Sequence, residues 1–136
     1  MIRSAPLSEP LWWRQLRRLH RLKYAMHTIA FLFKRKPGMT REAFEHHYKE
    51  VHGPMVAKLP GLIEYRQCPV REANRGDVHA HVPSGFDALS IYTFESVGAA
   101  EAAWNSPANE PVQHDTREFI DVETMVTLPL FVRTVV

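Results

Sequence analysis

Two strand-like segments that are apolar at almost every position place the strongest constraint on the fold. Residues 26–33 and 122–132 are rich in residues that favour strands. In the first segment, one alternating set is Ile29, Phe31 and Phe33, and the set between them is also mainly apolar. Successive side chains of a strand point to opposite faces of a sheet. These strands therefore need cover on both faces, whereas a simple one-layer sheet has a polar face.

The remaining segments alternate between the period of a strand and the period of a helix. The order strand, helix, strand, strand, helix, strand is predicted for residues 26–33, 40–55, 62–70, 86–94, 96–104 and 122–132, with a further helical turn or two in 110–120. Thr40 and Ser96 are suitable N-caps for the two helices. This order predicts an α+β fold, in which split βαβ units form a four-stranded antiparallel sheet with two helices on one face.

Helices on one face leave the second apolar face of this sheet without cover. We therefore expect a homodimer, in which a second copy covers that face around an enclosed apolar cavity. A bound apolar ligand is the other possible cover. Any chemistry on an apolar small molecule would take place in this cavity.

Residues 1–25 form a basic N-terminal extension to a domain at residues 26–136. The extension holds six basic side chains and Glu9, whereas acidic residues outnumber basic ones in the domain. Residues 11–23 can form an amphipathic helix with leucines on one side and arginines on the other. The alternatives are a disordered arm, an arm that packs on the domain or another subunit, a membrane-surface or targeting helix, and a segment that precedes a natural start at Met26.

The composition excludes several classes of protein. The net charge of +2 comes from the extension, so the domain lacks the basic surface that a nucleic-acid-binding fold needs. No apolar run approaches the ~20 residues that span a membrane. Cys68 is the single cysteine, which excludes an internal disulfide and favours a cytoplasmic protein. Glycine motifs for dinucleotides or a P-loop and a nucleophile elbow are also absent from the sequence.

The chain contains eight histidines, the side chain whose charge changes near neutral pH. His46, His79 and His81 are interpreted as solvated surface residues and not as metal ligands, because no third ligand has suitable spacing. We therefore expect neither a metal nor another cofactor. His47 is placed on a different face of the first helix from His46.

His52 lies in a different environment from these histidines. It follows Tyr48 by four residues on the apolar side of the first helix, where Gly53-Pro54 is predicted to end or kink that helix. The helix dipole favours the imidazolium there, and burial favours the neutral ring. These opposing effects suit a general acid or base at neutral pH, and a C-capping histidine is the structural alternative.

Several short runs, taken in order, resemble the EthD family. They are residues 33–40 (FKRKPGMT) followed by Phe44 and Tyr48, then His52-Gly53-Pro54, Leu59-Pro60-Gly61 and Tyr65, and finally residues 115–121 (DTREFID). The resemblance covers residues 26–132 and implies a ferredoxin-like protomer in a dimeric α/β barrel. It also implies small-molecule chemistry in ether or aromatic catabolism or polyketide tailoring, and related barrels include cofactor-free monooxygenases and lactone isomerases. Asp115, Phe119 and Asp121 match the late motif and are interpreted as structural residues.

The resemblance favours a pocket role for His52, with Tyr48 one turn earlier, as the two catalytic residues. Four further residues are predicted to bind the substrate: Tyr65, Asp87, Tyr92 and Trp104. Each has a structural alternative. Asp87 can be a turn residue at the start of a strand, Trp104 a core residue, and the two tyrosines cross-strand packing partners.

The leading hypothesis is a small cofactor-independent enzyme that acts on an apolar aromatic, lactone or polyketide-like molecule, as an oxidoreductase of the monooxygenase type. His52 would move a proton to or from the substrate, and the dry cavity near Tyr48 would stabilise the resulting anion. An isomerase or lyase that uses the same proton transfer is one alternative. A haem- or metal-dependent barrel and a non-catalytic protein that binds a hydrophobic metabolite are the others.

Overall fold

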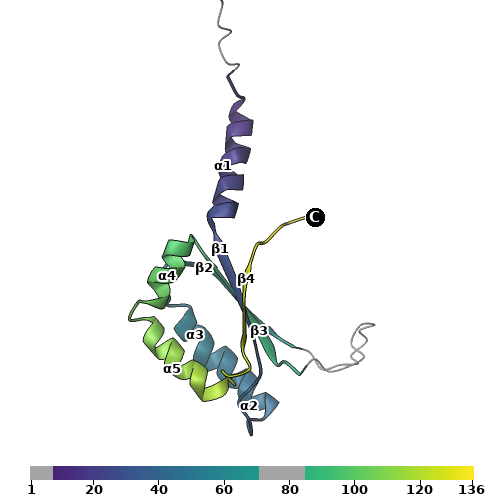
Figure 1. The fold of residues 1–136 in the computed structure, drawn as a ribbon, viewed down its shortest axis with the longest axis vertical. Coiled ribbons are helices and arrows are strands. Elements are labelled where there is room, and N and C mark those ends of the chain that lie inside the picture. Colours follow the sequence, from purple (N-terminus) through teal and green to yellow (C-terminus); the bar gives the residue numbers. More distant parts are fainter. Residues whose placement is uncertain (1–7, 71–84) are drawn as a thin grey trace, which may run out of the picture.

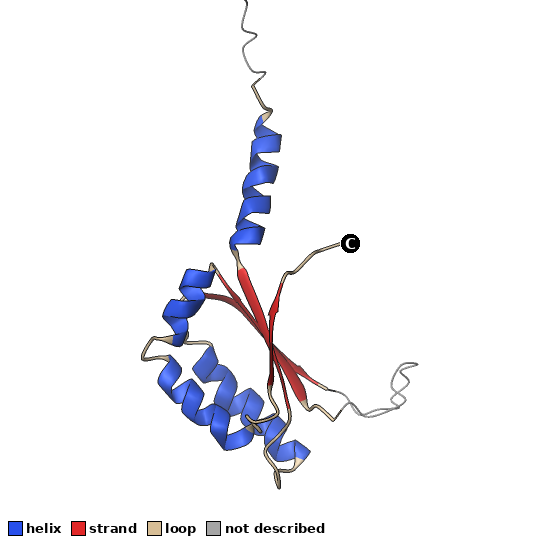
Figure 2. Cartoon of the chain, in the orientation of Figure 1, coloured by secondary structure: helices blue, strands red, loops and turns tan. Residues whose placement is uncertain are grey.

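The structure, a computed structural model, describes residues 8–70 and 85–136, without the side chains of residues 20–25. Its elements are α1 (Leu11–Ala25), β1 (His27–Phe33), α2 (Arg41–His46), the π-helix η1 (His47–His52), α3 (Gly53–Val56), β2 (Leu62–Pro69), β3 (Ala88–Phe94), α4 (Val97–Trp104), α5 (Asn109–Phe119) and β4 (Val126–Leu130). The helices from α2 to α5 lie on one side of the sheet, and α1 stands away from it (Figures 1 and 2). Within the described residues, no helix is both long and apolar enough to cross a membrane.

The four strands form one antiparallel sheet in the order β2-β3-β1-β4. This arrangement is the ferredoxin-like α+β fold, and it confirms the predicted fold class. The last strand is shorter than predicted, since β4 covers Val126–Leu130 and not 122–132. The chain before β4 turns instead of extending, with the N–H of Met125 donating to the carbonyl of Val122 and the Thr124 hydroxyl donating to the carboxylate of Asp121.

Helix α5 covers 11 residues and is longer than the predicted turn or two. Its buried residues Val112, Asp115 and Phe119 recur at steps of three and four, which is the spacing of one helix face. Polar residues between them obscure this period in the sequence. The buried face of α5 therefore combines apolar side chains with one carboxylate.

The core lies between the sheet and the helices, where aromatic rings from distant parts of the chain meet. Phe33 of β1 packs against Phe44, Tyr48 and Phe119, with ring centroids 5.5 to 6.4 Å apart. Phe44 and Phe119 have no exposed surface. Because Phe44 and Tyr48 belong to the first helical segment and Phe119 to α5, this cluster fixes both segments against β1.

At Gly53-Pro54, where the sequence predicted an end or a kink, the first helical segment changes from a π turn to α3 and continues to Val56. The N–H of Gly53 donates to the carbonyl of Tyr48, five residues earlier. Pro54 has no N–H, and in a regular α-helix its ring would collide with the carbonyl four residues before it. The wider π turn accommodates the proline. His52 therefore lies inside a continuous helical segment, and the dipole of a helix end does not act on it.

The sheet face opposite the helices is mainly apolar over β1, β3 and β4, and the Glu64–Arg66 ion pair of β2 forms its polar edge. Val126, Leu128 and Leu130 of β4 point to this face, and each is 39% to 40% exposed. Their partners on β1 include Ala30 and Leu32. The strands are therefore apolar on both faces, as their sequences predict, and one face remains open to another surface.

Replacing Phe119 with alanine should lower the free energy of unfolding by about 3–5 kcal/mol, because it leaves a cavity among buried rings. Phe131→Ala is the matched control, since Phe131 is 95% exposed and its removal should change stability little. Urea denaturation followed by circular dichroism measures both. Equal losses in the two variants would contradict the central position of Phe119 in the core.

Candidate functional site

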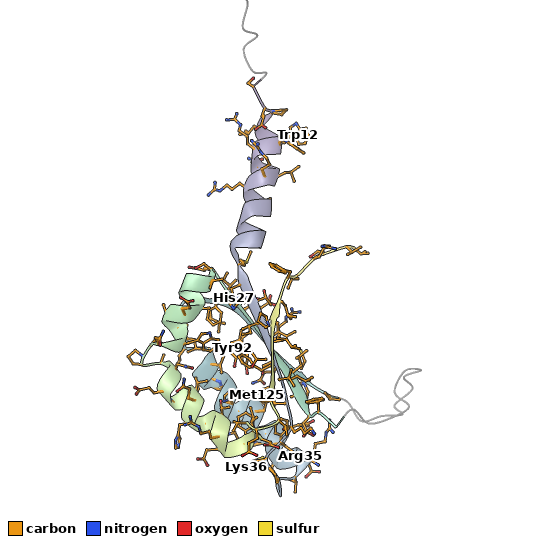
Figure 3. All side chains as sticks on the ribbon, in the orientation of Figure 1. Trp12, His27, Arg35, Lys36, Tyr92 and Met125 are labelled. Carbon is orange, nitrogen blue, oxygen red and sulfur yellow. The ribbon has the colours of Figure 1, made fainter. Side chains whose placement is uncertain are left out.

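A pocket of about 450 Å³ lies between the helix-covered face of the sheet and α5. Its apolar wall is formed by Phe31, Phe33, Tyr92, Trp104, Val112, Ile120, Val122 and Met125. Its polar groups come from His52, Ser90, Asn109, Gln113, Thr116 and Arg117. Figure 3 labels two of the lining residues, Tyr92 of the sheet and Met125 before β4. This pocket lies on the helix-covered face, where side chains of α5 contribute to its wall, and the cavity expected between the sheet and a second copy stays a prediction.

Asp115 of α5 holds two histidines of η1 at the same time. Its Oδ2 lies 2.9 Å from Nδ1 of His52, and its Oδ1 lies 2.7 Å from Nε2 of His47. His52 and Asp115 are buried, at 3% and 5% exposure. The ring of Phe119 lies 4.7 Å from the ring of His47 and 4.9 Å from that of His52. The carboxylate is thus shared between two imidazoles beside an aromatic side chain.

The π-helix explains how residues five apart reach one carboxylate. In an α-helix, positions five apart differ by about 140° around the axis. The π turn is wider and pairs each residue with the fifth along the chain, so His47 and His52 come to the same side. At the α-helical period, His47 and His52 lie on different sides of the helix. For this reason His47 was not among the predicted site residues.

Burial and the carboxylate act in opposite directions on His52. Burial lowers the pKa of His52 below its ordinary value of 6.5, and the hydrogen bond and negative charge of Asp115 oppose this shift. The net lowering keeps the ring neutral at neutral pH. Because Nδ1–H donates to Asp115, Nε2 is left with its lone pair, and His52 lines the pocket. This arrangement suits a general base whose protonated form is stabilised by a carboxylate.

Tyr48 is placed behind the pocket and is not one of the lining residues. Its hydroxyl lies 2.6 Å from Oγ of Ser90, which does line the pocket. Burial raises the pKa of Tyr48 far above its ordinary value, so the phenol stays neutral. Gln67 Nε2 donates to the carbonyl of Tyr48 at 2.7 Å and helps to hold this residue in place. Tyr48 therefore acts on the pocket through Ser90.

Two of the predicted substrate-binding residues, Tyr92 and Trp104, line the pocket together with His52. Their rings make an edge contact with centroids 5.6 Å apart. Trp104 also contacts Phe31 from β1, at 6.2 Å. Burial raises the pKa of Tyr92 well above its ordinary value, so its hydroxyl is also protonated at neutral pH.

The other two predicted substrate-binding residues, Tyr65 and Asp87, do not line the pocket. Tyr65 lies next to Tyr92, with ring centroids 4.8 Å apart, and its hydroxyl accepts a hydrogen bond from Gln67. The carboxylate of Asp87 accepts the N–H of Arg35 at 2.8 Å. This bond ties the start of β3 to the turn after β1, which matches the structural alternative for Asp87.

Sequence reasoning missed most of the contribution of α5. It interpreted Asp115 as a structural residue, whereas the structure places this carboxylate against two histidines. Four further polar residues of α5 line the pocket. Asn109, Gln113 and Thr116 are separated by four and three positions, and Arg117 comes directly after Thr116. This helical spacing of polar residues was the available signal, because it predicts one polar-lined face on a helix.

No metal centre is found in the part of the chain that the structure describes, since no three His, Cys, Asp or Glu side chains gather there. His46 is exposed on α2, as predicted. His79 and His81, together with most of the loop predicted around them, lie outside the described residues. The histidines that do come together, His47 and His52, share a carboxylate.

Residues 36–123 match the EthD domain. The chain belongs to the EthD family. The matched region contains η1 and α5, and therefore both histidines and the carboxylate between them. Among curated proteins, none matches the sequence significantly.

Solved structures share the EthD-like fold at low sequence identity. An EthD family protein from Bacillus halodurans is 18% identical with a TM-score of 0.63, and the match covers 79% of this chain and 99% of that one. SnoaB from Streptomyces nogalater, described as a cofactor-independent oxygenase, is 16% identical with a TM-score of 0.57, covering 82% and 97%. A hydroxynitrile lyase from Passiflora edulis is 17% identical with a TM-score of 0.58, covering 82% and 96%. A ferredoxin-like protein from Bacteroides fragilis, described as dimeric, is 12% identical with a TM-score of 0.57, covering 79% and 97%.

Replacing Asp115 with asparagine should lower the pKa of His52 further, because the charge that opposes the effect of burial is removed. NMR titration of the His52 ring measures this change. Glu118→Gln is the matched control, since Glu118 is an exposed carboxylate on the same helix that pairs with His114. An unchanged His52 titration in Asp115→Asn would show that the carboxylate does not influence this ring.

Proposed function

We propose that this EthD-family protein is a cofactor-independent enzyme that removes a proton from an apolar aromatic, lactone or polyketide-like small molecule. The observation that carries the proposal is the buried His52–Asp115 pair, because Asp115 engages Nδ1 and the His52 ring lines a mainly apolar pocket. Nε2 takes the proton from an acidic C–H or O–H group, and Asp115 pairs with the imidazolium that forms. His52 then returns the proton to another atom of the substrate or to a leaving group.

The lining of the pocket favours a flat apolar substrate that becomes an anion during the reaction. Phe31, Tyr92 and Trp104 meet edge to face, with centroids 5.4 to 6.2 Å apart. The volume of about 450 Å³ is typical of a small-molecule site. Arg117 supplies a positive charge and Ser90 a hydroxyl, and both stabilise an enolate or phenolate in such a site.

The anion has two possible fates, and the leading one is reaction with molecular oxygen. In that case two hydrogens leave a substrate carbon, one oxygen atom enters, and the second oxygen atom becomes water, so the substrate supplies all the electrons. The fold shared with SnoaB supports this reaction class. The alternative is elimination or isomerisation, which the fold shared with a hydroxynitrile lyase supports. Oxygen consumption distinguishes the two.

We further propose that two copies pair through the uncovered sheet face. Leu128 and its neighbours on β4 adjoin half-buried Leu32 and Ile91 at the centre of the sheet, which makes an apolar surface bordered by Glu64 and Arg66 of β2. Burial of such a surface stabilises an assembly by about 25 cal/mol for each Å². The dimeric ferredoxin-like protein from Bacteroides fragilis supports this arrangement.

Replacing His52 with glutamine should reduce proton abstraction by about 10²- to 10⁴-fold, because the general base is lost. Exchange of deuterium from heavy water into aromatic ketones and lactones with an acidic C–H, followed by mass spectrometry, measures this step before either fate of the anion. His46→Gln is the matched control, since His46 is exposed. In the wild type, exchange should fall as the pH drops through the lowered pKa of His52, below 6.5, because only the neutral ring accepts a proton. Equal exchange in His52→Gln and wild type would remove His52 from the mechanism.

Replacing Leu128 with glutamate should convert the dimer into monomers, because a charge would be buried in an apolar interface. Val97→Glu is the control, since Val97 is 55% exposed on α4, on the helix side of the sheet. Light scattering coupled to size-exclusion chromatography gives both masses. A wild-type monomer at micromolar concentration, or a dimeric Leu128→Glu, would contradict the proposed interface.

A further inference from the structure

Helix α1 carries apolar side chains that belong to neither of the core clusters formed by the described residues. Trp12, Leu16 and Leu19 are 50% to 64% exposed. Figures 1 and 3 show α1 projecting from the domain, with Trp12 far from the pocket residue Tyr92. Exposed tryptophan and leucine on a single helix indicate a surface that binds something other than this domain.

Three exposed apolar residues of α1 lie on one side of the helix, and three arginines lie on the opposite side. At 3.6 residues a turn, Trp12, Leu16 and Leu19 fall within about 60° of the circumference. Arg14, Arg17 and Arg18 fall within about 100° centred on the opposite side. The helix contains no acidic residue, and only Glu9, just before it, pairs with Arg17. Further along the helix, the same period puts Arg21 with the arginines and Lys23 with the apolar positions.

We propose that α1 binds the surface of membranes that contain anionic lipids. The arginines pair with lipid phosphates, and the tryptophan and leucines enter the boundary between headgroups and acyl chains. A nucleic acid would attract the arginines but leave Trp12 and Leu16 in water. A second copy of α1 would cover the apolar side but supply no negative charge, because the helix has none. An anionic lipid surface satisfies both sides of this helix.

The C-terminal segment reaches the same end of the sheet. Thr28 pairs with Leu130, so the chain enters β1 beside the point where it leaves β4. Figure 1 shows α1 and the C-terminus extending from that end. Phe131 is 95% exposed and Val132 is 53% exposed, and Arg133 follows them. Both terminal segments therefore present apolar and basic residues in one direction, where one lipid surface can contact them together.

Vesicle flotation with the full chain tests this proposal, using phosphatidylglycerol mixed with phosphatidylcholine, and phosphatidylcholine alone. The chain should float with the anionic vesicles, bind them less at high salt, and show a blue shift of tryptophan emission. Arg14→Gln with Arg18→Gln should weaken partitioning by about 25-fold, since each basic residue near the surface contributes about fivefold. Trp12→Ala with Leu16→Ala should abolish the blue shift and weaken binding.

Lys49→Gln with Lys58→Gln is the matched control, because it removes the same charge from exposed sites on the domain and should leave binding unchanged. Circular dichroism checks that every variant is folded. Equal binding by the arginine variant and this control, or no preference for anionic vesicles, would overturn the proposal. Binding to duplex DNA without binding to vesicles would assign α1 to nucleic acid. A lower oligomeric mass of the Trp12 and Leu16 variant without vesicle binding would assign it to contact between copies. Either assignment also overturns the proposal.

Discussion

The sharing of the Asp115 carboxylate between His47 and His52 is the interaction on which the site depends. A buried carboxylate is costly unless hydrogen-bond donors surround it, and here each of its oxygens lies within hydrogen-bond distance of an imidazole nitrogen. The contact joins η1 to α5 and engages Nδ1 of His52, whose ring lines the pocket. It therefore holds α5 over the sheet and also selects the tautomer of the histidine at the pocket wall.

This contact exists because the first helical segment contains a π turn ahead of Pro54. A proline that would break an α-helix is accommodated by the wider turn, and the same turn brings residues five apart to one side. One feature of the backbone thus solves a steric problem and builds the histidine pair. Tyr48, in the same turn, has its carbonyl bound by both Gly53 and Gln67. Its hydroxyl meets Ser90, so the turn also fixes the floor of the pocket.

Strands β1 and β4 are apolar on both faces, and the two faces of the sheet have different surroundings. On one face, helices enclose the pocket and the proposed base. On the other, the leucines of β4 and β1 remain available for a second surface. The shared fold at 18% identity with another EthD protein shows that this framework tolerates wide changes in side chains. The chemistry must therefore be argued from the residues of the pocket and not from the fold. The basic helix α1 projects from the domain, away from both faces (Figure 1).

The sequence alone determined the order of the elements, the apolar character of both strand faces and the caps at Thr40 and Ser96, because these depend on local periodicity and local hydrogen bonds. It also placed His52, Tyr92 and Trp104 among the site candidates that the pocket contains. Only the tertiary structure decided that Asp115 meets His52, that Tyr48 lies behind Ser90, and that Asp87 ties a turn. These contacts join residues separated by 42 to 63 positions in the sequence. The location of this pocket under the helices followed from the way α5 packs, which no local pattern specifies.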